Sequence, residues 1–348
     1  MAFSAQITLS PLGANTGPFN LYSDIDGYTT PFETNIPRSS FLIPYTTNNV
    51  PDSTTIIEVR SSGLCTNSEF LPISGLPVPL GVWSTAGALI TARSYLAGAG
   101  TQSAALAFGG RATYSATSCA ESYDGTSWSS VASLITVRFG LAGAGTQNEA
   151  VAFGGVTTPF VLVSCSEEYN GSSWSSVGSL STARYSLGGA GTQNAGLAFG
   201  GGASPGIVSC TEEYDGSSWS TVSSLITGRQ GISGSGTQNA GLAFGGQPGY
   251  SCTEEYDGSS WSAGGALIAP RYRLAGAGTQ SDGLAFGGIG PTGNVACTEE
   301  YNGSSWSTGG ALIVSRSELG GAGTQNAGLG FGGRITAGDV SCTEEYSS

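Results

Sequence analysis

Residues 210–246 have the sequence CTEEYDGSSWSTVSSLITGRQGISGSGTQNAGLAFGG, and variants of this stretch make up most of the 348-residue chain. Its tryptophan recurs at intervals of 45, 46, 45, 42 and 45 residues. The six copies are Trp83, Trp128, Trp174, Trp219, Trp261 and Trp306. A period of 42 to 46 residues indicates one small folding unit repeated along the chain.

Other residues keep a constant distance from each tryptophan, so the units share one internal register. An arginine lies ten residues after each tryptophan, at Arg93, Arg138, Arg184, Arg229, Arg271 and Arg316. A Gly-Thr-Gln turn follows, and a Phe-Gly-Gly triplet begins 25 residues after the tryptophan. From the second Gly of this triplet to the next cysteine the spacing varies from 6 to 10 residues. A segment that alone absorbs length changes is expected to be a surface loop.

Each unit contains four short segments with the pattern of β-strands, and none with helical periodicity and caps. They are Leu-Ala-Gly-Ala-Gly, Gly-Leu-Ala-Phe-Gly, Ser-Cys-Thr-Glu-Glu-Tyr and Ser-Ser-Trp-Ser, or close variants of these. The Asp-Gly and Asn-Gly pairs between the last two segments are strong hairpin signals. Four strands in about 45 residues correspond to one blade of a β-propeller, whose small first strand suits the crowded central channel.

The register also predicts how the ring closes. The array begins at Trp83, which belongs to a fourth strand, and ends at Cys342–Tyr346, a third strand with no tryptophan after it. We therefore predict an all-β fold in which residues 81–348 form a six-bladed propeller and the N-terminal strand completes the last blade. Such closure leaves no free sheet edge.

Residues 1–74 lack the repeat and contain short β-patterned segments punctuated by prolines. They predict a small N-terminal β domain. The proline-bearing stretch 75–80, Gly-Leu-Pro-Val-Pro-Leu, predicts a stiff linker.

A Gly-Gly doublet, then a tyrosine, then a tryptophan five residues later, with an arginine in the next connection, resembles the kelch-type β-propeller repeat. Tyr214 and Trp219 illustrate this spacing. The family's common histidine after the arginine is absent. The near-identical Glu-Glu-Tyr-Asp-Gly-Ser-Ser-Trp and Gly-Ala-Gly-Thr-Gln motifs resemble kelch-like arrays of bacteriophage virion proteins. The first 80 residues also resemble the attachment regions of phage virion proteins.

Composition excludes several function classes. The chain has no His, and all 11 of its basic residues are Arg, so it lacks a Ser–His triad, imidazole metal ligands and a Schiff-base lysine. A net charge of −13 argues against binding nucleic acid. There is no apolar run of membrane-spanning length and no signal-peptide pattern at the N-terminus. We predict no catalytic residue, no metal and no cofactor.

Two repeated residue types are candidates for sites. The six cysteines at one position per blade lie too far apart for disulfides, which favours buried residues on the third strands over metal or redox chemistry. The six arginines either converge on one mouth as an anion site or tie the connections between blades. The acidic residues in every blade favour the structural interpretation of the arginines. The six tryptophans are assigned as structural blade residues as well.

The antiparallel strand order places the variable loops and the arginine connections on one face, opposite the Gly-Thr-Gln and Asp-Gly turns. Aromatic and arginine side chains occur there in no repeated pattern. Binding specificity is expected where the blades differ. The candidate ligand-contact residues are Tyr114, Phe160, Tyr185, Tyr250, Tyr272 and Arg273.

The resemblance implies a non-enzymatic phage virion structural protein, a tail-fibre or spike component assembled in the host cytoplasm. Its N-terminal domain is expected to bind other virion proteins, and its propeller to bind a host-surface glycan or protein. We expect a homo-oligomer without membrane insertion. Two alternatives are a free lectin-like glycan-binding propeller and an intracellular scaffold propeller that binds a peptide.

Overall fold

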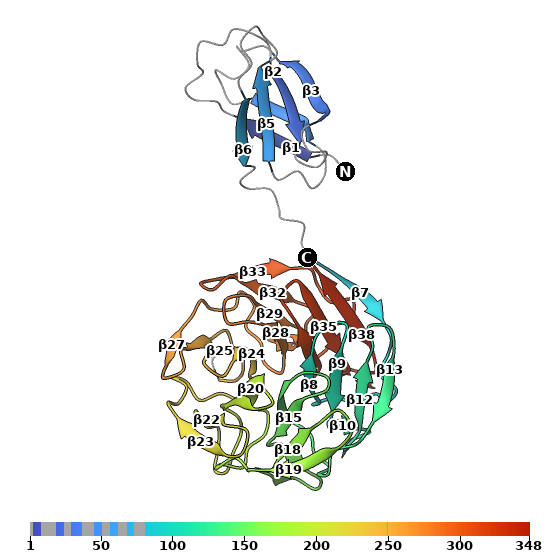
Figure 1. Ribbon diagram of the computed structural model, residues 1–348, viewed down its shortest axis with the longest axis vertical. Coiled ribbons are helices and arrows are strands. Elements are labelled where there is room, and N and C mark those ends of the chain that lie inside the picture. Colours follow the sequence, from blue (N-terminus) through green and yellow to red (C-terminus); the bar gives the residue numbers. More distant parts are fainter. Residues whose placement is uncertain are drawn as a thin grey trace. The chain divides into compact units, whose positions relative to one another are not determined.

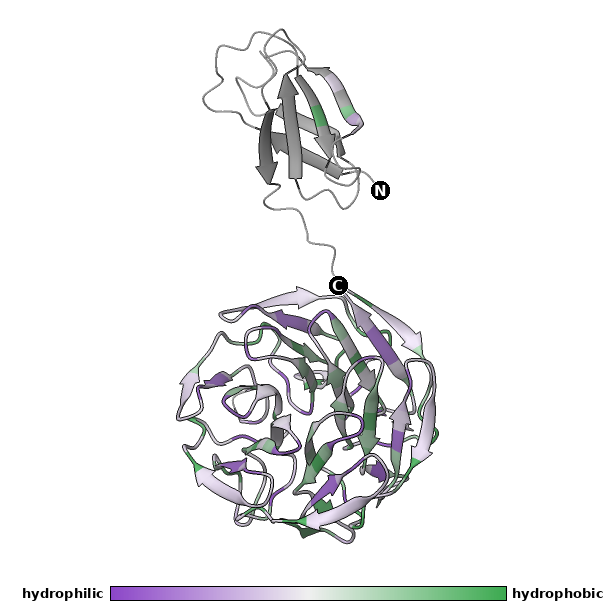
Figure 2. Ribbon diagram, viewed as in Figure 1, coloured by the Kyte–Doolittle hydropathy of each residue, from purple (hydrophilic) through white to green (hydrophobic). Residues whose placement is uncertain are grey.

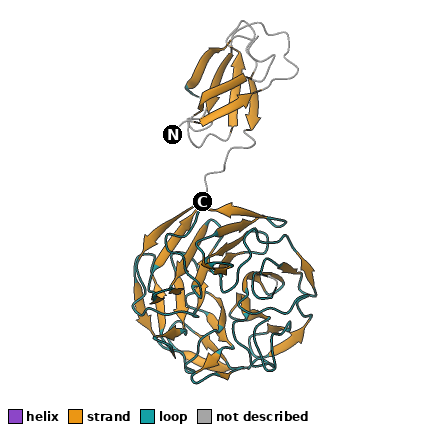
Figure 3. Cartoon of the chain, turned by 180° about the vertical axis from the view of Figure 1, so that it is seen from behind, coloured by secondary structure: helices purple, strands orange, loops and turns teal. Residues whose placement is uncertain are grey.

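The computed structural model describes residues 3–7, 19–23, 29–36, 45–50, 56–61, 68–72, 81–248 and 250–348. The chain divides into two compact units, Met1–Pro79 and Leu80–Ser348, which we describe separately. All regular secondary structure in the described residues is β-strand (Figure 3). None of these residues forms a helix that could cross a membrane.

The second unit is a ring of six four-stranded antiparallel blades, as the repeat predicted (Figure 1). The blades are numbered along the chain by their innermost strands, and the strands of each blade are named from the channel outward. Blade 1 consists of β8 (Ala97–Gly100), β9 (Ala105–Phe108), β12 (Ala120–Tyr123) and β13 (Trp128–Val131). Blade 2 consists of β14 (Ala142–Gly145), β15 (Ala150–Phe153), β18 (Ser166–Tyr169) and β19 (Trp174–Val177). Blade 3 consists of β20 (Gly188–Thr192), β21 (Ala195–Phe199), β22 (Thr211–Tyr214) and β23 (Trp219–Val222). Blade 4 consists of β24 (Ser233–Thr237), β25 (Ala240–Phe244), β26 (Thr253–Tyr256) and β27 (Trp261–Ala263). Blade 5 consists of β28 (Ala275–Gly278), β29 (Gly283–Phe286), β32 (Thr298–Tyr301) and β33 (Trp306–Gly309). Blade 6 consists of β34 (Gly320–Gly323), β35 (Ala327–Phe331), β38 (Thr343–Ser347) and β7 (Val82–Ala86).

The ring closes between the two ends of the repeat array. Strand β7 pairs with β38, with Trp83 opposite Tyr346, so the first strand of the array completes the last blade. Figure 1 shows β7 beside β38 at the junction. The predicted six-bladed fold and its N-terminal closure are confirmed.

Small residues on the innermost strands allow neighbouring blades to approach each other closely. A Cβ atom at Gly98 would lie 2.5 Å from Cζ of Phe331 and 2.6 Å from the carbonyl oxygen of Gly321. Figure 2 shows the apolar residues concentrated on the inner strands, while the Ser- and Thr-rich outermost strands are pale. The core therefore lies between blades, around the channel.

Each blade tryptophan packs across the junction to the preceding blade. Trp128 lies 5.0 Å from the ring of Phe331 and donates from Nε1 to Thr343 Oγ1 at 3.0 Å. Five of the six tryptophans are buried, and Trp219 is partly buried beside Phe153, 4.8 Å away. The tryptophans thus join the sheets into one ring.

Blade 1 differs from the other blades at two positions, Ala120 and Ser122. Two side chains of blade 2 therefore donate their hydrogen bonds to different acceptors. Ala120 replaces the hydroxyl residue that accepts from tryptophan, so Trp174 Nε1 donates to the carbonyl oxygen of Ala132 at 2.9 Å. Ser122 replaces the glutamate that accepts from tyrosine, so the hydroxyl of Tyr169 donates to the carbonyl oxygen of Gly171 at 3.0 Å.

The structure corrects several local expectations. The six cysteines are partly exposed and lie one residue before the third strands rather than buried on them, because the cysteine carbonyl accepts from the first glycine of the Phe-Gly-Gly triplet. In blades 1 to 5 the fourth strand begins at tryptophan, because the preceding serines belong to the turn. Four variable loops contain unpredicted two-stranded hairpins: β10 (Arg111–Ala112) with β11 (Ser115–Ala116), β16 (Val156–Thr157) with β17 (Val161–Leu162), β30 (Ile289–Gly290) with β31 (Gly293–Asn294), and β36 (Arg334–Ile335) with β37 (Gly338–Asp339).

In the first unit, β1 (Phe3–Ile7) pairs with β4 (Tyr45–Val50). A second sheet has the order β3 (Pro31–Ile36), β2 (Phe19–Ser23), β5 (Ile56–Ser61) and β6 (Ser68–Pro72). The predicted linker, 75–80, lies outside the described residues. The domain assignment over 1–74 stays a prediction.

Candidate functional site

The variable loops and the arginine connections lie together on one side of the propeller, which we call the loop face. The residue after each arginine pairs with the residue after the Phe-Gly-Gly triplet, for example Ser94 with Arg111 and Tyr272 with Ile289. We call the opposite side, which holds the Thr-Gln and Asp-Gly turns, the turn face. The two faces are therefore chemically distinct surfaces of one repeat.

The six blade arginines lie beneath the loop face and are fully buried. Each forms an ion pair with the first glutamate of the third strand in the blade it leads into; Arg229 and Glu254 are 2.8 Å apart. The carboxylate also accepts backbone N–H groups of the connection, such as Ile226 N at 2.7 Å. The pairs are Arg93–Glu121, Arg138–Glu167, Arg184–Glu212, Arg229–Glu254, Arg271–Glu299 and Arg316–Glu344. These guanidinium groups hold the connections to the blades and are shielded from solvent.

A closed ring of backbone hydrogen bonds surrounds the channel mouth on the loop face. Its members are the residues two after each arginine, and each N–H donates to the carbonyl of the member before it over 2.7 to 2.9 Å. All six have left-handed φ values between 51° and 62°. They are Tyr95, Gly140, Ser186, Gly231, Arg273 and Glu318. The backbone at this mouth is uniform, whereas the side chains differ in every blade except the two glycines.

The cavity on the ring axis is small. It has a volume of about 140 Å³ and is lined by the mouth ring and the inner strands. Pockets for drug-sized ligands usually measure about 300–1,000 Å³. A ligand larger than a few atoms therefore does not fit inside this cavity.

One sector of the mouth carries charge. Arg273 pairs with Glu318 at 2.8 Å, and its guanidinium lies 5.1 Å from the ring of Tyr95 and 5.4 Å from that of Tyr272. Arg111 lies 3.7 Å from the second oxygen of Glu318. Burial, and then the charge of Glu318, raise the pKa of Tyr95 well above its usual range. Its phenol therefore remains a neutral hydrogen-bonding group.

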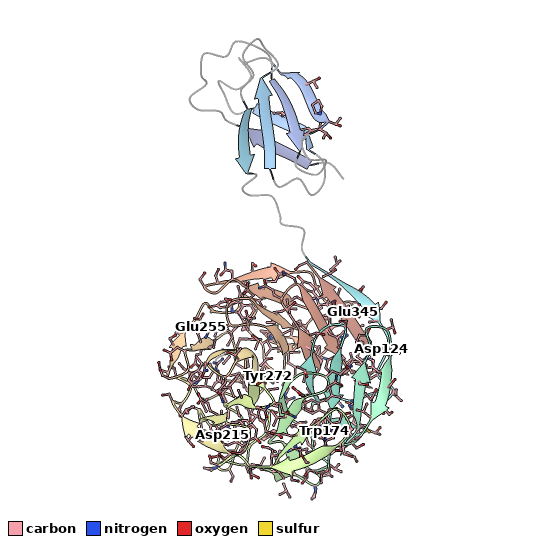
Figure 4. The ribbon with its side chains drawn as sticks, in the orientation of Figure 1. Asp124, Trp174, Asp215, Glu255, Tyr272 and Glu345 are labelled. Atoms are coloured by element: carbon pink, nitrogen blue, oxygen red, sulfur yellow. The ribbon has the colours of Figure 1, made fainter. Side chains whose placement is uncertain are left out.

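The predicted contact residues occupy three positions around the loop face. Tyr114, 71% exposed, stands at the tip of the blade 1 hairpin. Phe160 packs edge-on against Tyr185 at 5.4 Å, and Tyr250 against Tyr272 at 5.7 Å. Figure 4 shows Tyr272 near the centre of the ring, with Asp215 and Glu255 nearer its rim. The six candidates therefore share a face but do not form one pocket.

Four charged residues of the loop face were missing from the sequence candidates: Arg111 and Glu318, described above, and the ion pair of Arg334 with Asp339. A usable signal was present, because only Arg111, Arg273 and Arg334 among the arginines of residues 81–348 stand outside the repeat register. The residue type alone could not distinguish Glu318 from other glutamates, since every blade contains glutamates.

No protein-family model matches the chain, and no curated protein matches it significantly. Within the described residues, no group of three or more His, Cys, Asp or Glu side chains is arranged to hold a metal ion.

Proposed function

We propose that this chain is a non-enzymatic recognition protein whose propeller binds a surface ligand through the loop face. One observation supports this proposal most directly. The six blades have the same backbone at the channel mouth but different side chains above it, and several of these are exposed aromatics. The packing of identical blades does not require different side chains at equivalent positions, whereas recognition of an irregular ligand does.

The proposed setting is a bacteriophage virion, with the chain serving as a tail-fibre or spike component that contacts the host. The kelch-like repeat and its similarity to phage arrays support this setting. In this proposal the first unit binds other virion proteins, the protein is a homo-oligomer, and the propeller binds a host-surface glycan or protein.

Cell binding by the purified full-length chain tests the recognition face. We expect combined replacement of Tyr114, Phe160, Tyr250 and Tyr272 by Ser to reduce binding to host cells at least tenfold, because it removes the exposed ring surfaces. The matched control replaces Thr146, Thr192 and Thr237, exposed on the turn face, by Ala. Equal loss in both variants, or loss in the control alone, would assign recognition to a different surface.

The setting needs a separate measurement. Mass spectrometry of purified particles should detect the chain in stoichiometric amounts if it is a virion component. A chain that is absent from particles yet retained on glycan columns would be a free lectin-like propeller instead.

A further inference from the structure

We infer that Arg111 is the anion-binding residue of the loop face and that it recognises the carboxylate of an acidic saccharide. This inference rests on the proposed recognition function and specifies its ligand class. The site lies where blade 1 meets the channel mouth, and it combines one guanidinium that donates no hydrogen bond with three aromatic rings.

The guanidinium of Arg111 has unused hydrogen-bonding capacity. Among residues 81–248 and 250–348, it is the one arginine whose side chain donates no hydrogen bond, and its Nε is buried without a partner. Its nearest carboxylate oxygen, on Glu318, is 3.7 Å away, beyond hydrogen-bonding distance. Guanidinium donors at a protein surface gain most from a carboxylate that accepts two of them at once.

Aromatic rings hold this group in place. The Arg111 guanidinium carbon lies 5.0 Å from the ring centre of Tyr95, 5.6 Å from that of Phe139 and 5.9 Å from that of Tyr114. Cation–π contacts of this length restrain the side chain without using its N–H groups. With 21% of the side chain exposed, Arg111 is fixed in position and still reachable from solvent.

The local charge favours an anion despite a net charge of −13 for the chain. The three partly exposed arginines of the described propeller, Arg111, Arg273 and Arg334, face only two carboxylates, Glu318 and Asp339. Arg273 binds one oxygen of Glu318 and Arg334 binds Asp339 at 2.9 Å. The excess positive charge therefore resides on Arg111.

Tyr114 supplies the argument for a saccharide. Thr113 and Tyr114 have φ values of 48° and 68° at the tip of the β10–β11 hairpin, a turn in which Asn and Gly are preferred. A strained, 71% exposed tyrosine contributes little to stability, and such outliers often mark functional sites. Its ring gives a flat apolar platform beside the guanidinium, the combination that orients a sugar ring bearing a carboxylate.

Arg334 is the arginine most similar to Arg111 in position, and it shows what an engaged guanidinium looks like at this sector. Like Arg111, it follows a Phe-Gly-Gly triplet and begins a loop hairpin. However, it already donates to Asp339 and, at 3.1 Å, to the hydroxyl of Tyr114. Two of its five N–H donors are therefore already engaged, whereas no side-chain donor of Arg111 is.

The test is calorimetric titration of the full-length chain with oligogalacturonate, hyaluronan oligomers and oligosialic acid, and with the methyl esters of whichever of these bind. Wild type should bind at least one acidic oligomer, and it should bind the methyl ester of that oligomer at least tenfold more weakly. Arg111→Ala should weaken binding at least tenfold, and Arg111→Lys nearly as much, because lysine cannot form the bidentate contact. Thr237→Ala, exposed on the turn face, should change the affinity less than threefold.

Three results would overturn the inference: no binding of any acidic oligomer, equal binding of acid and ester, or Arg111→Ala binding like wild type. Binding of mannose 6-phosphate in place of every carboxylate probe would overturn the carboxylate assignment. Cell binding separates this inference from the proposed function. If wild type binds cells but Arg111→Ala binds them equally well, the inference alone fails; if wild type binds acidic oligomers through Arg111 but no cells, host recognition alone fails.

Discussion

On the turn face, the glutamine of every Thr-Gln turn reaches back to the preceding blade and donates to the carbonyl of its third-strand tyrosine over 2.5 to 2.7 Å. On the loop face, the residues above the buried arginines differ in every blade. Both faces are made by the same repeat. The contrast shows that a side chain is fixed where it joins two blades and free where it meets only solvent.

The buried Arg–Glu pairs sharpen this contrast, because they belong to the loop side but lie beneath its surface. They are identical in all six blades, as the turn-face glutamines are. Contacts within the blade framework, rather than the side of the ring, therefore distinguish these repeated residues from the loop side chains.

The largest expected effect on stability comes from breaking one of these buried ion pairs. Glu254→Gln leaves Arg229 buried and charged without its partner, and should lower the free energy of unfolding by about 3–5 kcal/mol. Chemical denaturation at pH 7 measures it. The matched control is the adjacent Glu255→Gln, since the amide still accepts from the Tyr301 hydroxyl and should cost below about 1 kcal/mol. Equal, small effects in both would show that the ion pair is not a structural requirement.

Much of this framework could be predicted from the sequence because it is repeated. Six tryptophans in register determine the number of blades, and an array that starts at Trp83 and ends without a tryptophan determines the closure. The partner of each arginine could not be predicted, because in five of the six blades two adjacent glutamates satisfy the same pattern. One of them, such as Glu254, pairs with arginine, and the other, such as Glu255, accepts from a tyrosine of the next blade.

The candidate site was predicted only in part for the opposite reason. Tyr114, Phe160 and Tyr250 could be recognised as loop aromatics, but no repeat specifies how irregular loops fold. The approach of Arg111 to Tyr95 depends on the mouth ring, which brings blades 1, 5 and 6 together through backbone contacts that residue types do not encode.

An intermediate effect is expected for a turn-face glutamine. Gln238→Ala removes two donations across one junction, to the carbonyls of Tyr214 at 2.7 Å and Gly196 at 3.2 Å. It should lower the free energy of unfolding by about 1–2 kcal/mol, since each hydrogen bond contributes about 0.5–1.5 kcal/mol. The neighbouring Thr237→Ala, exposed at the same turn, should stay within about 0.5 kcal/mol. If the two variants were equally stable, the presence of the same glutamine in all six blades could not be explained by its hydrogen bonds to the preceding blade.

The smallest effect tests whether charge matters on the turn face. Asp257 accepts at Oδ1 from the backbone N–H groups of Ser259 and Ser260 at 2.8 and 2.7 Å, and hydrogen bonds from the Ser259 hydroxyl and these N–H groups lower its pKa to about 2. Asn170 and Asn302 make the same turns elsewhere in the ring, so Asp257→Asn should leave stability at pH 7 nearly unchanged. Because the folded-state pKa is lowered, the carboxylate contributes stability above its unfolded value of about 3.9, and this contribution is lost as the pH falls toward 2. Thermal melts from pH 5 to pH 2 should therefore decline less steeply for Asp257→Asn than for wild type. Identical slopes would mean that these turns depend on the oxygen acceptor alone, and that the recurring aspartates are, like the loop-face side chains, free to vary.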